Sequence, residues 1–162
     1  KTPHVTEDQI KAAFVDEMNR VIANKDQVLA DIRMLIVALT DTRELEEKEA
    51  SAGKELETVS ESMRKLFDAY AHALIEEGEY DDRYAELLTQ SQTLENHISQ
   101  IGKQREQRKA RKRDLDAFYK ALKATGPIVE FDEELWNAAV VSAMVEKNGA
   151  MQFQLRDRTG IT

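Results

Sequence analysis

Two long stretches of the chain carry a stripe of mostly apolar or long side chains that advances by four residues and then by three. In the longer stretch, polar and charged residues fill most of the other positions, and the stripe occupies residues 80, 84, 87, 91, 94, 98, 101, 105, 108, 112, 115, 119 and 122. A 3.5-residue repeat kept over about six heptads is typical of a coiled-coil helix. At about 1.5 Å per residue, this helix would be roughly 65 Å long.

The shorter stretch supplies a partner for this helix. The same rhythm runs through residues 45, 49, 52, 56, 59, 63, 66, 70 and 73. Two consecutive helices joined by a short connection run antiparallel. We therefore predict an antiparallel coiled-coil hairpin over residues 43–125, with its tip near 71–79, where helix propensity falls at Gly78.

Two registers of this hairpin are plausible, and they differ by about one helical turn. In the first, Tyr70 lies opposite Tyr84 and Glu49 lies opposite Arg105. In the second, Tyr70 lies opposite Tyr80, and Arg105 faces an aliphatic residue. We prefer the first register because it gives the core arginine a carboxylate partner.

The residues before and after the predicted hairpin predict a small helical base. Residues 1–42 contain two amphipathic helices: Thr6 opens the first with a capping-box pattern, and the second runs over roughly 26–39. Near its C-terminal end the long helix outruns its hairpin partner, so its last apolar residues need these two helices as cover. They are Leu115, Phe118, Tyr119 and Leu122.

The last region, 126–162, begins with Gly126-Pro127, which ends the long helix. Asp132 is a good N-cap for a short helix over about 133–141, and Asn148-Gly149 predicts a β-hairpin that completes a sheet or packs on the base. The predicted fold is mainly α: a long antiparallel coiled-coil hairpin on a small helical base, with a short helix and a β-hairpin packed on that base.

The composition agrees with long helices, and the sequence contains no recognisable catalytic or metal-binding motif. Charged residues make up 33% of the chain and aromatic residues 6%, and cysteine is absent. The histidines are isolated, no glycine-rich phosphate loop follows a strand, and no apolar run is long enough to span a membrane. We expect no active site, cofactor, metal site, small-molecule substrate or membrane contact here. Because the chain begins with Lys1 and not with Met, we expect it to be a piece of a longer protein.

A basic run in the long helix has two interpretations. It includes Lys103, Arg108, Lys109, Arg111, Lys112 and Arg113. Such a run could contact DNA phosphates. Alternatively, it faces the acidic helix before it while the rest is solvated, and the net charge of −8 favours this second interpretation.

Three motifs, in order along the chain, resemble the C-terminal region of transposon-type large serine recombinases. Residues 2–14 (TPHVTEDQIKAAF) resemble the segment after that family's zinc ribbon. Residues 79–84 (EYDDRY), followed by Leu87, resemble the stretch after its coiled-coil turn, and residues 130–136 (EFDEELW) resemble the motif that closes its coiled coil. Residues 140–157 echo the family's ending, although Arg158 stands where a glycine is common.

The resemblance implies a non-catalytic module of a site-specific DNA recombinase encoded by a mobile element in the bacterial cytoplasm. The catalytic serine domain, the zinc and the main DNA-binding surfaces would belong to the rest of the parent, so DNA binding by this chain would be weak or absent. The module would contact other recombinase subunits and so influence synapsis and directionality. By this analogy, the contact residues at the tip are Leu74, Ile75, Tyr80 and Tyr84.

Two alternatives to the recombinase module remain. A generic coiled-coil stalk or adaptor would carry the same heptads, because heptads specify helices and not a biological role. An auxiliary DNA-contacting arm would use the basic run over 103–113, and would predict strongly salt-dependent binding to duplex DNA.

Overall fold

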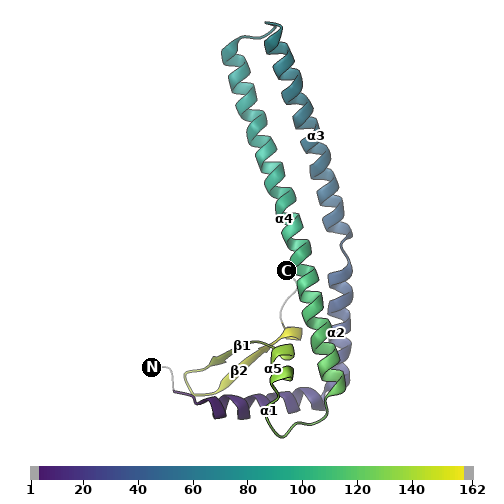
Figure 1. Ribbon diagram of the computed structural model, residues 1–162, viewed down its shortest axis with the longest axis vertical. Coiled ribbons are helices and arrows are strands. Elements are labelled where there is room, and N and C mark those ends of the chain that lie inside the picture. The colour runs from purple at the N-terminus through teal and green to yellow at the C-terminus, as the bar shows by residue number, and fades with distance from the viewer. Residues whose placement is uncertain (1–3, 159–162) are drawn as a thin grey trace. The chain divides into compact units, whose positions relative to one another are not determined.

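The computed structural model describes residues 4–158 and confirms a mainly helical chain with a small C-terminal β-hairpin (Figure 1). The ends of the predicted regions, residues 1–3 and 159–162, lie outside the described residues. The elements are α1 (Glu7–Ala23), α2 (Lys25–Thr40), α3 (Arg43–Ala71), α4 (Glu77–Ala124), α5 (Glu133–Ala139), β1 (Val140–Val145), β2 (Met151–Leu155) and the 3-10 turn η1 (Arg156–Arg158).

The chain divides into two compact units that share the continuous helix α4. The base unit contains the residues up to 40 and those from 108 onward, and the hairpin unit contains residues 41–107. The last part of α4, which was predicted to need cover from the first two helices, therefore belongs to the base unit. We describe each unit by itself.

The base unit has one hydrophobic core to which every one of its helices and β2 contribute. Its fully buried side chains come from α1, α2, α4, α5 and β2, and include Phe14, Ile32, Leu115, Phe118, Leu122, Leu135 and Leu155. As predicted, Leu115, Phe118 and Leu122 at the end of α4 are covered within this core. Burying each such side chain contributes about 1.5–3 kcal/mol.

Polar contacts fix the ends of the base helices. Thr6 and Gln9 form the predicted capping box at the start of α1. The Asp132 side chain accepts a hydrogen bond from the Leu135 N–H (2.9 Å), which confirms it as the N-cap of α5. The Asn19 amide both donates to the carbonyl oxygen of Ile128 (2.8 Å) and accepts from its N–H (2.9 Å), so it holds the loop between α4 and α5.

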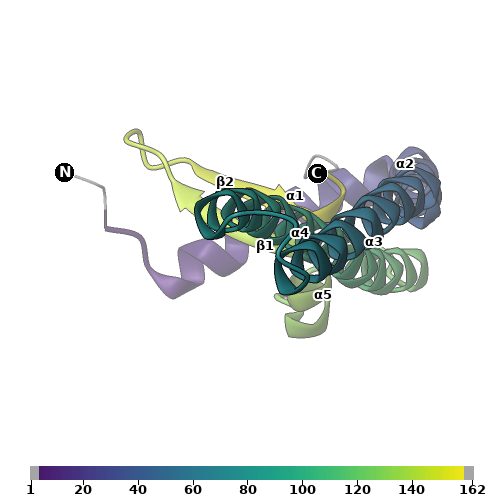
Figure 2. The same cartoon turned by 90° about the horizontal axis from the view of Figure 1, so that it is seen from above.

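The β-hairpin is confirmed, but its loop is longer than the two residues of an Asn-Gly turn. The strands β1 and β2 pair antiparallel side by side (Figure 2), and Val145 pairs with Met151. The Glu146 N–H donates to the Ala150 carbonyl (2.8 Å), which leaves three residues in the loop. Gly149 lies at φ 85°, a left-handed conformation that glycine adopts without strain. One face of β2 packs on the base core through Phe153 and Leu155.

In the hairpin unit, α3 and the first part of α4 lie side by side and run antiparallel (Figure 1 and Figure 2). Most positions of the predicted stripe are shielded in both helices, although Tyr70 at the end of α3 is 38% exposed. In α3 its buried members are seven residues apart: Leu45, Ala52, Val59 and Leu66. In α4, the stripe positions from 80 to 105 are half-buried or buried, except Tyr84, which is 38% exposed.

The structure combines contacts from the two predicted registers. Glu49 and Arg105 form a salt bridge with 2.6 Å between carboxylate and guanidinium, as in the preferred register. Nearer the turn, however, Tyr70 stacks on Tyr80 with ring centroids 4.5 Å apart, so the predicted pairing of Tyr70 with Tyr84 is wrong. The physical reason is reach: long Glu and Arg side chains can span a shift of about one turn, whereas stacked rings must be adjacent.

Candidate interaction site at the tip of the hairpin unit

The turn between α3 and α4 closes through backbone hydrogen bonds. The Leu74 N–H donates to the Ala69 carbonyl and the Ala73 N–H donates to the Tyr70 carbonyl, both at 2.9 Å. These are the two bonds of a Schellman motif. Ala73 occupies the left-handed position of that motif, at φ 56°, where glycine is usual. An L-residue with a Cβ is disfavoured there, so the turn holds local strain.

Three tyrosines stack beside this turn. The Tyr80 ring lies between Tyr70 (4.5 Å, 25° between planes) and Tyr84 (5.7 Å, 19°). Tyr80 is half-buried by this arrangement, while Tyr70 and Tyr84 are each 38% exposed. The stack joins the end of α3 to the start of α4 and leaves Tyr70 and Tyr84 partly exposed.

Of the four predicted tip residues, Leu74 and Tyr84 are exposed, whereas Ile75 and Tyr80 are half-buried. The structure adds Tyr70 and Phe67 to the exposed set, the latter 59% exposed. Phe67 is a large apolar residue off the heptad stripe, and that displacement is the sequence signal by which it could have been found. We call these six residues the tip cluster: Phe67, Tyr70, Leu74, Ile75, Tyr80 and Tyr84.

Acidic residues surround the tip cluster. The turn and the first residues of α4 contain Glu76, Glu77, Glu79, Asp81 and Asp82. Arg83 pairs with Glu79 at 2.7 Å. The tip therefore combines exposed aromatic surface with negative charge. A partner surface would need apolar area and either basic groups or enough salt to screen like charges.

The basic run does not form a single face of α4. Successive residues of a helix are about 100° apart, so these six side chains point around the helix. Arg108 and Lys112 lie on the half-buried stripe, and Lys112 pairs with Asp116 at 2.8 Å. Arg111 is also half-buried, while Lys103, Lys109 and Arg113 are exposed.

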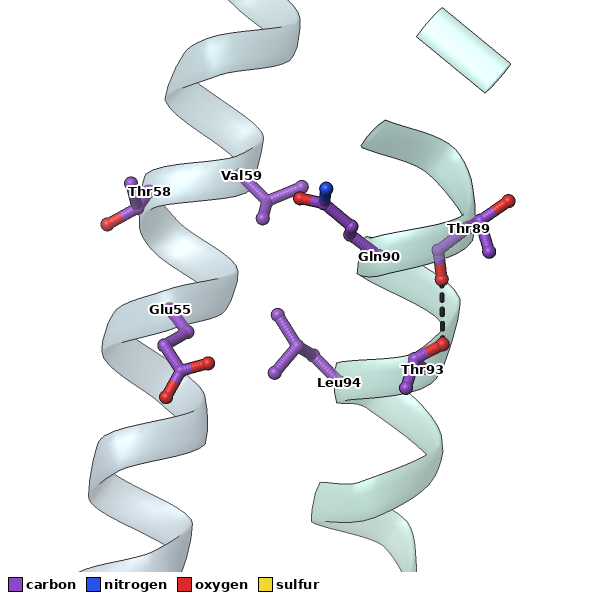
Figure 3. A pocket seen from close by; sticks show the side chains of 7 residues that line it. All are labelled: Glu55, Thr58, Val59, Thr89, Gln90, Thr93 and Leu94. Carbon is purple, nitrogen blue, oxygen red and sulfur yellow. Dashed lines mark hydrogen bonds between the residues drawn. The ribbon is translucent and has the colours of Figure 1, made fainter. Parts of the chain in front are cut away.

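A groove of about 480 Å³ lies between α3 and α4 within the hairpin unit (Figure 3). Val59 and Leu94 point into it from opposite helices. The hydroxyls of Thr58, Thr89 and Thr93 each donate to the backbone carbonyl four residues earlier, at 2.9–3.0 Å. These bonds tie the three hydroxyls to the backbones of their own helices.

Within residues 4–158, no group of three or more His, Cys, Asp or Glu side chains is arranged to hold a metal ion. In the same part of the chain, no helix has the length and apolar character that crossing a bilayer requires. Comparison of the chain with family models, with curated proteins and with solved structures finds no match.

Proposed function

We propose that this chain is the C-terminal coiled-coil module of a large serine recombinase. In this proposal α3 and α4 form an antiparallel coiled coil, and the tip cluster of one subunit contacts the module of another. These contacts control synapsis and the direction of site-specific DNA recombination. The 4-3 stripe, the EFDEELW motif at residues 130–136 and the exposed tip cluster support the proposal.

The distribution of exposed apolar residues carries this proposal. Every large hydrophobic residue that is exposed in the hairpin unit lies within residues 67–88: Phe67, Tyr70, Leu74, Tyr84 and Leu88. Farther from the turn, the large apolar side chains of the hairpin unit lie on the shielded stripe. Clustered exposed aromatics are typical of protein–protein contacts, in which Tyr and Trp contribute much of the binding energy.

The parent protein would supply the remaining parts. A serine catalytic domain, a zinc ribbon and the main DNA-binding surface would come from outside this chain, in a cytoplasmic protein encoded by a mobile element. The coding sequence upstream of Lys1 tests this directly. A resolvase-like serine domain and cysteine pairs are expected there, and an unrelated domain would contradict the recombinase assignment while leaving a coiled-coil adaptor in its place.

The role of the tip is tested in the parent recombinase with the double variant Phe67→Ala/Tyr84→Ala. We expect synaptic complexes, measured by gel shift with two attachment-site DNAs, to be lost while binding to a single site is kept. The control is Met34→Ala/Val37→Ala, which removes two apolar side chains of α2 that are 72% and 71% exposed. Unchanged synapsis in the tip variant would contradict the proposed contact.

The DNA-arm alternative has its own measurement. An arm formed by the basic run would bind duplex DNA at low salt, with affinity that falls steeply as salt rises. We expect the isolated chain to show little binding, because two of the run's six cations lie on the half-buried stripe and the chain carries a net charge of −8. Tight low-salt binding that is lost in Lys103→Gln/Arg113→Gln would favour the arm.

A further inference from the structure

The base unit contains a cavity of about 360 Å³ whose lining side chains have no role in the proposed function. It lies between the start of α1 and the region around α5. Its lining includes two aromatic rings, Phe131 and Trp136, and two carboxylates, Glu7 and Glu133. Lys11 also lines it. Aromatic faces together with carboxylates are the combination that attracts organic cations.

The aromatic wall is held from behind by the buried core. The Phe14 ring, fully buried, contacts Phe131 at 5.5 Å and Trp136 at 5.0 Å between centroids. Phe153 packs edge-on against Trp136 at 5.9 Å. Asn19 fixes the loop that leads to Phe131, as described above. A wall fixed in this way needs little reordering on binding, which lowers the entropic cost.

The cavity already attracts one cation from its own chain. The Lys11 ammonium lies 2.7 Å from a Glu7 carboxylate oxygen and 5.4 Å from the centre of the Phe131 ring. The hydrogen bond that the Lys11 ammonium donates to the Glu7 carboxylate, with further attraction from Asp8 and Glu133, raises the pKa of Lys11. This internal contact shows that a positively charged group can lie beside both the Phe131 ring and the Glu7 carboxylate.

The surroundings remain acidic after Lys11 is counted. The two segments that border the cavity, residues 7–11 and 130–137, contain one lysine and six acids: Glu7, Asp8, Glu130, Asp132, Glu133 and Glu134. This charge disfavours phosphates and nucleic acids, and it favours a basic occupant. Arginine fits better than lysine, because its planar guanidinium stacks on an aromatic ring and bonds a carboxylate with two N–H groups.

We propose that this cavity binds an arginine side chain from a basic segment of a partner protein. The guanidinium lies against the rings of Phe131 and Trp136, between the carboxylates of Glu7 and Glu133, and displaces the Lys11 ammonium from Phe131. The contact is independent of the tip cluster and of the recombinase assignment, so either can fail without the other.

The full chain provides a direct readout, because Trp136 is its only tryptophan. We would titrate it with an acetylated tetra-arginine amide and follow tryptophan fluorescence, with tetra-citrulline as the neutral control of the same shape. Saturable change with the arginine peptide alone is expected. The absence of a saturable change, or an equal response to citrulline, would overturn the proposal.

Two pairs of variants separate a specific site from general attraction to an acidic protein. Glu133→Gln should weaken peptide binding about fivefold or more, while Glu86→Gln, an equal charge change on the exposed face of α4, should not. Lys11→Gln should strengthen binding, because it removes the internal competitor. Lys48→Gln is its matched control, since Lys48 pairs with Glu44 in the same i,i+4 geometry. Equal effects within each pair would overturn the proposal.

Discussion

The base unit and the hairpin unit use their aromatic residues in opposite ways. In the base, Phe14 and Phe118 are fully buried, and Phe131, Trp136 and Phe153 contact Phe14. In the hairpin, every aromatic residue lies within 67–84, and three of the four are exposed. The same residue type thus builds a core in one unit and an outward surface in the other.

The aliphatic residues differ as well. The base buries large side chains from five elements in one cluster, whereas the hairpin shields a narrow stripe in which buried positions recur every seven residues and one of them is only an alanine. We therefore expect one buried side chain of the base to contribute more to stability than one stripe position of the hairpin. This contrast predicts that single substitutions in the base should lower the unfolding free energy more than those in the hairpin.

The largest effect is expected from Phe14→Ala in the base. It removes the ring that three other aromatic residues contact, and leaves a cavity inside a closed core, so we expect a loss of about 3–5 kcal/mol in unfolding free energy. Urea denaturation followed by circular dichroism measures it. Phe67→Ala is the matched control: the same change at a 59% exposed position should cost little. Similar losses in the two variants would contradict the contrast between units.

Val59→Ala probes the hairpin stripe. Val59 is 8% exposed but borders the open groove, so its truncation loses burial without enclosing an empty cavity. We expect a loss of about 1–2 kcal/mol in the same denaturation experiment. Val37→Ala, at a 71% exposed position of α2, is the control for the chemical change itself. A loss as large as that of Phe14→Ala would show that the hairpin stripe acts as a core.

Ala73→Gly tests the strained turn of the hairpin. Glycine adopts the left-handed conformation at φ 56° without a steric penalty, so we expect a gain of about 1 kcal/mol. Ala50→Gly, at an exposed position inside α3, should instead lower stability, because glycine is a poor helix former. Destabilisation of the Ala73→Gly variant would argue against this backbone conformation.

The smallest effect concerns the ion pair between α3 and α4. Glu49 and Arg105 are 39% and 34% exposed, so solvent screens much of their attraction, and their contribution is about 0.5 kcal/mol. Glu49→Arg should lower the thermal midpoint slightly, and exchanging both residues should restore it. A double exchange that destabilises more than the single change would reject the pairing.

Periodicity, capping and turn chemistry predicted the mainly helical chain and its C-terminal β-hairpin. The stripe positions, the capping box at Thr6, the N-cap at Asp132 and the cover of Leu115 by the base all follow from local patterns of side chains. The register of α3 against α4 does not follow from such patterns, because a 4-3 stripe is compatible with a shift of one helical turn. The Glu49–Arg105 pair does not distinguish the two registers, since both long side chains can span that shift.

The tip was only partly predictable. Gly78 suggested the position of the turn, yet it lies inside the first turn of α4, and Ala73 adopts the left-handed conformation instead. Alanine carries no sequence signal for that conformation. Tyr70 was placed in the seam of the hairpin, but it forms one outer face of the tyrosine stack, because the ring of Tyr80 occupies the space opposite it.

The central claim is that the tip cluster mediates contacts between modules. Sedimentation equilibrium of the chain over a range of concentrations tests it most directly, with the variants Phe67→Ser/Tyr84→Ser and Met34→Ser/Val37→Ser for comparison. We predict that the average mass rises with concentration for the wild-type chain and for the α2 variant, while the tip variant remains monomeric. Equal association of all three proteins, or a wild-type chain that stays monomeric throughout, would contradict the account.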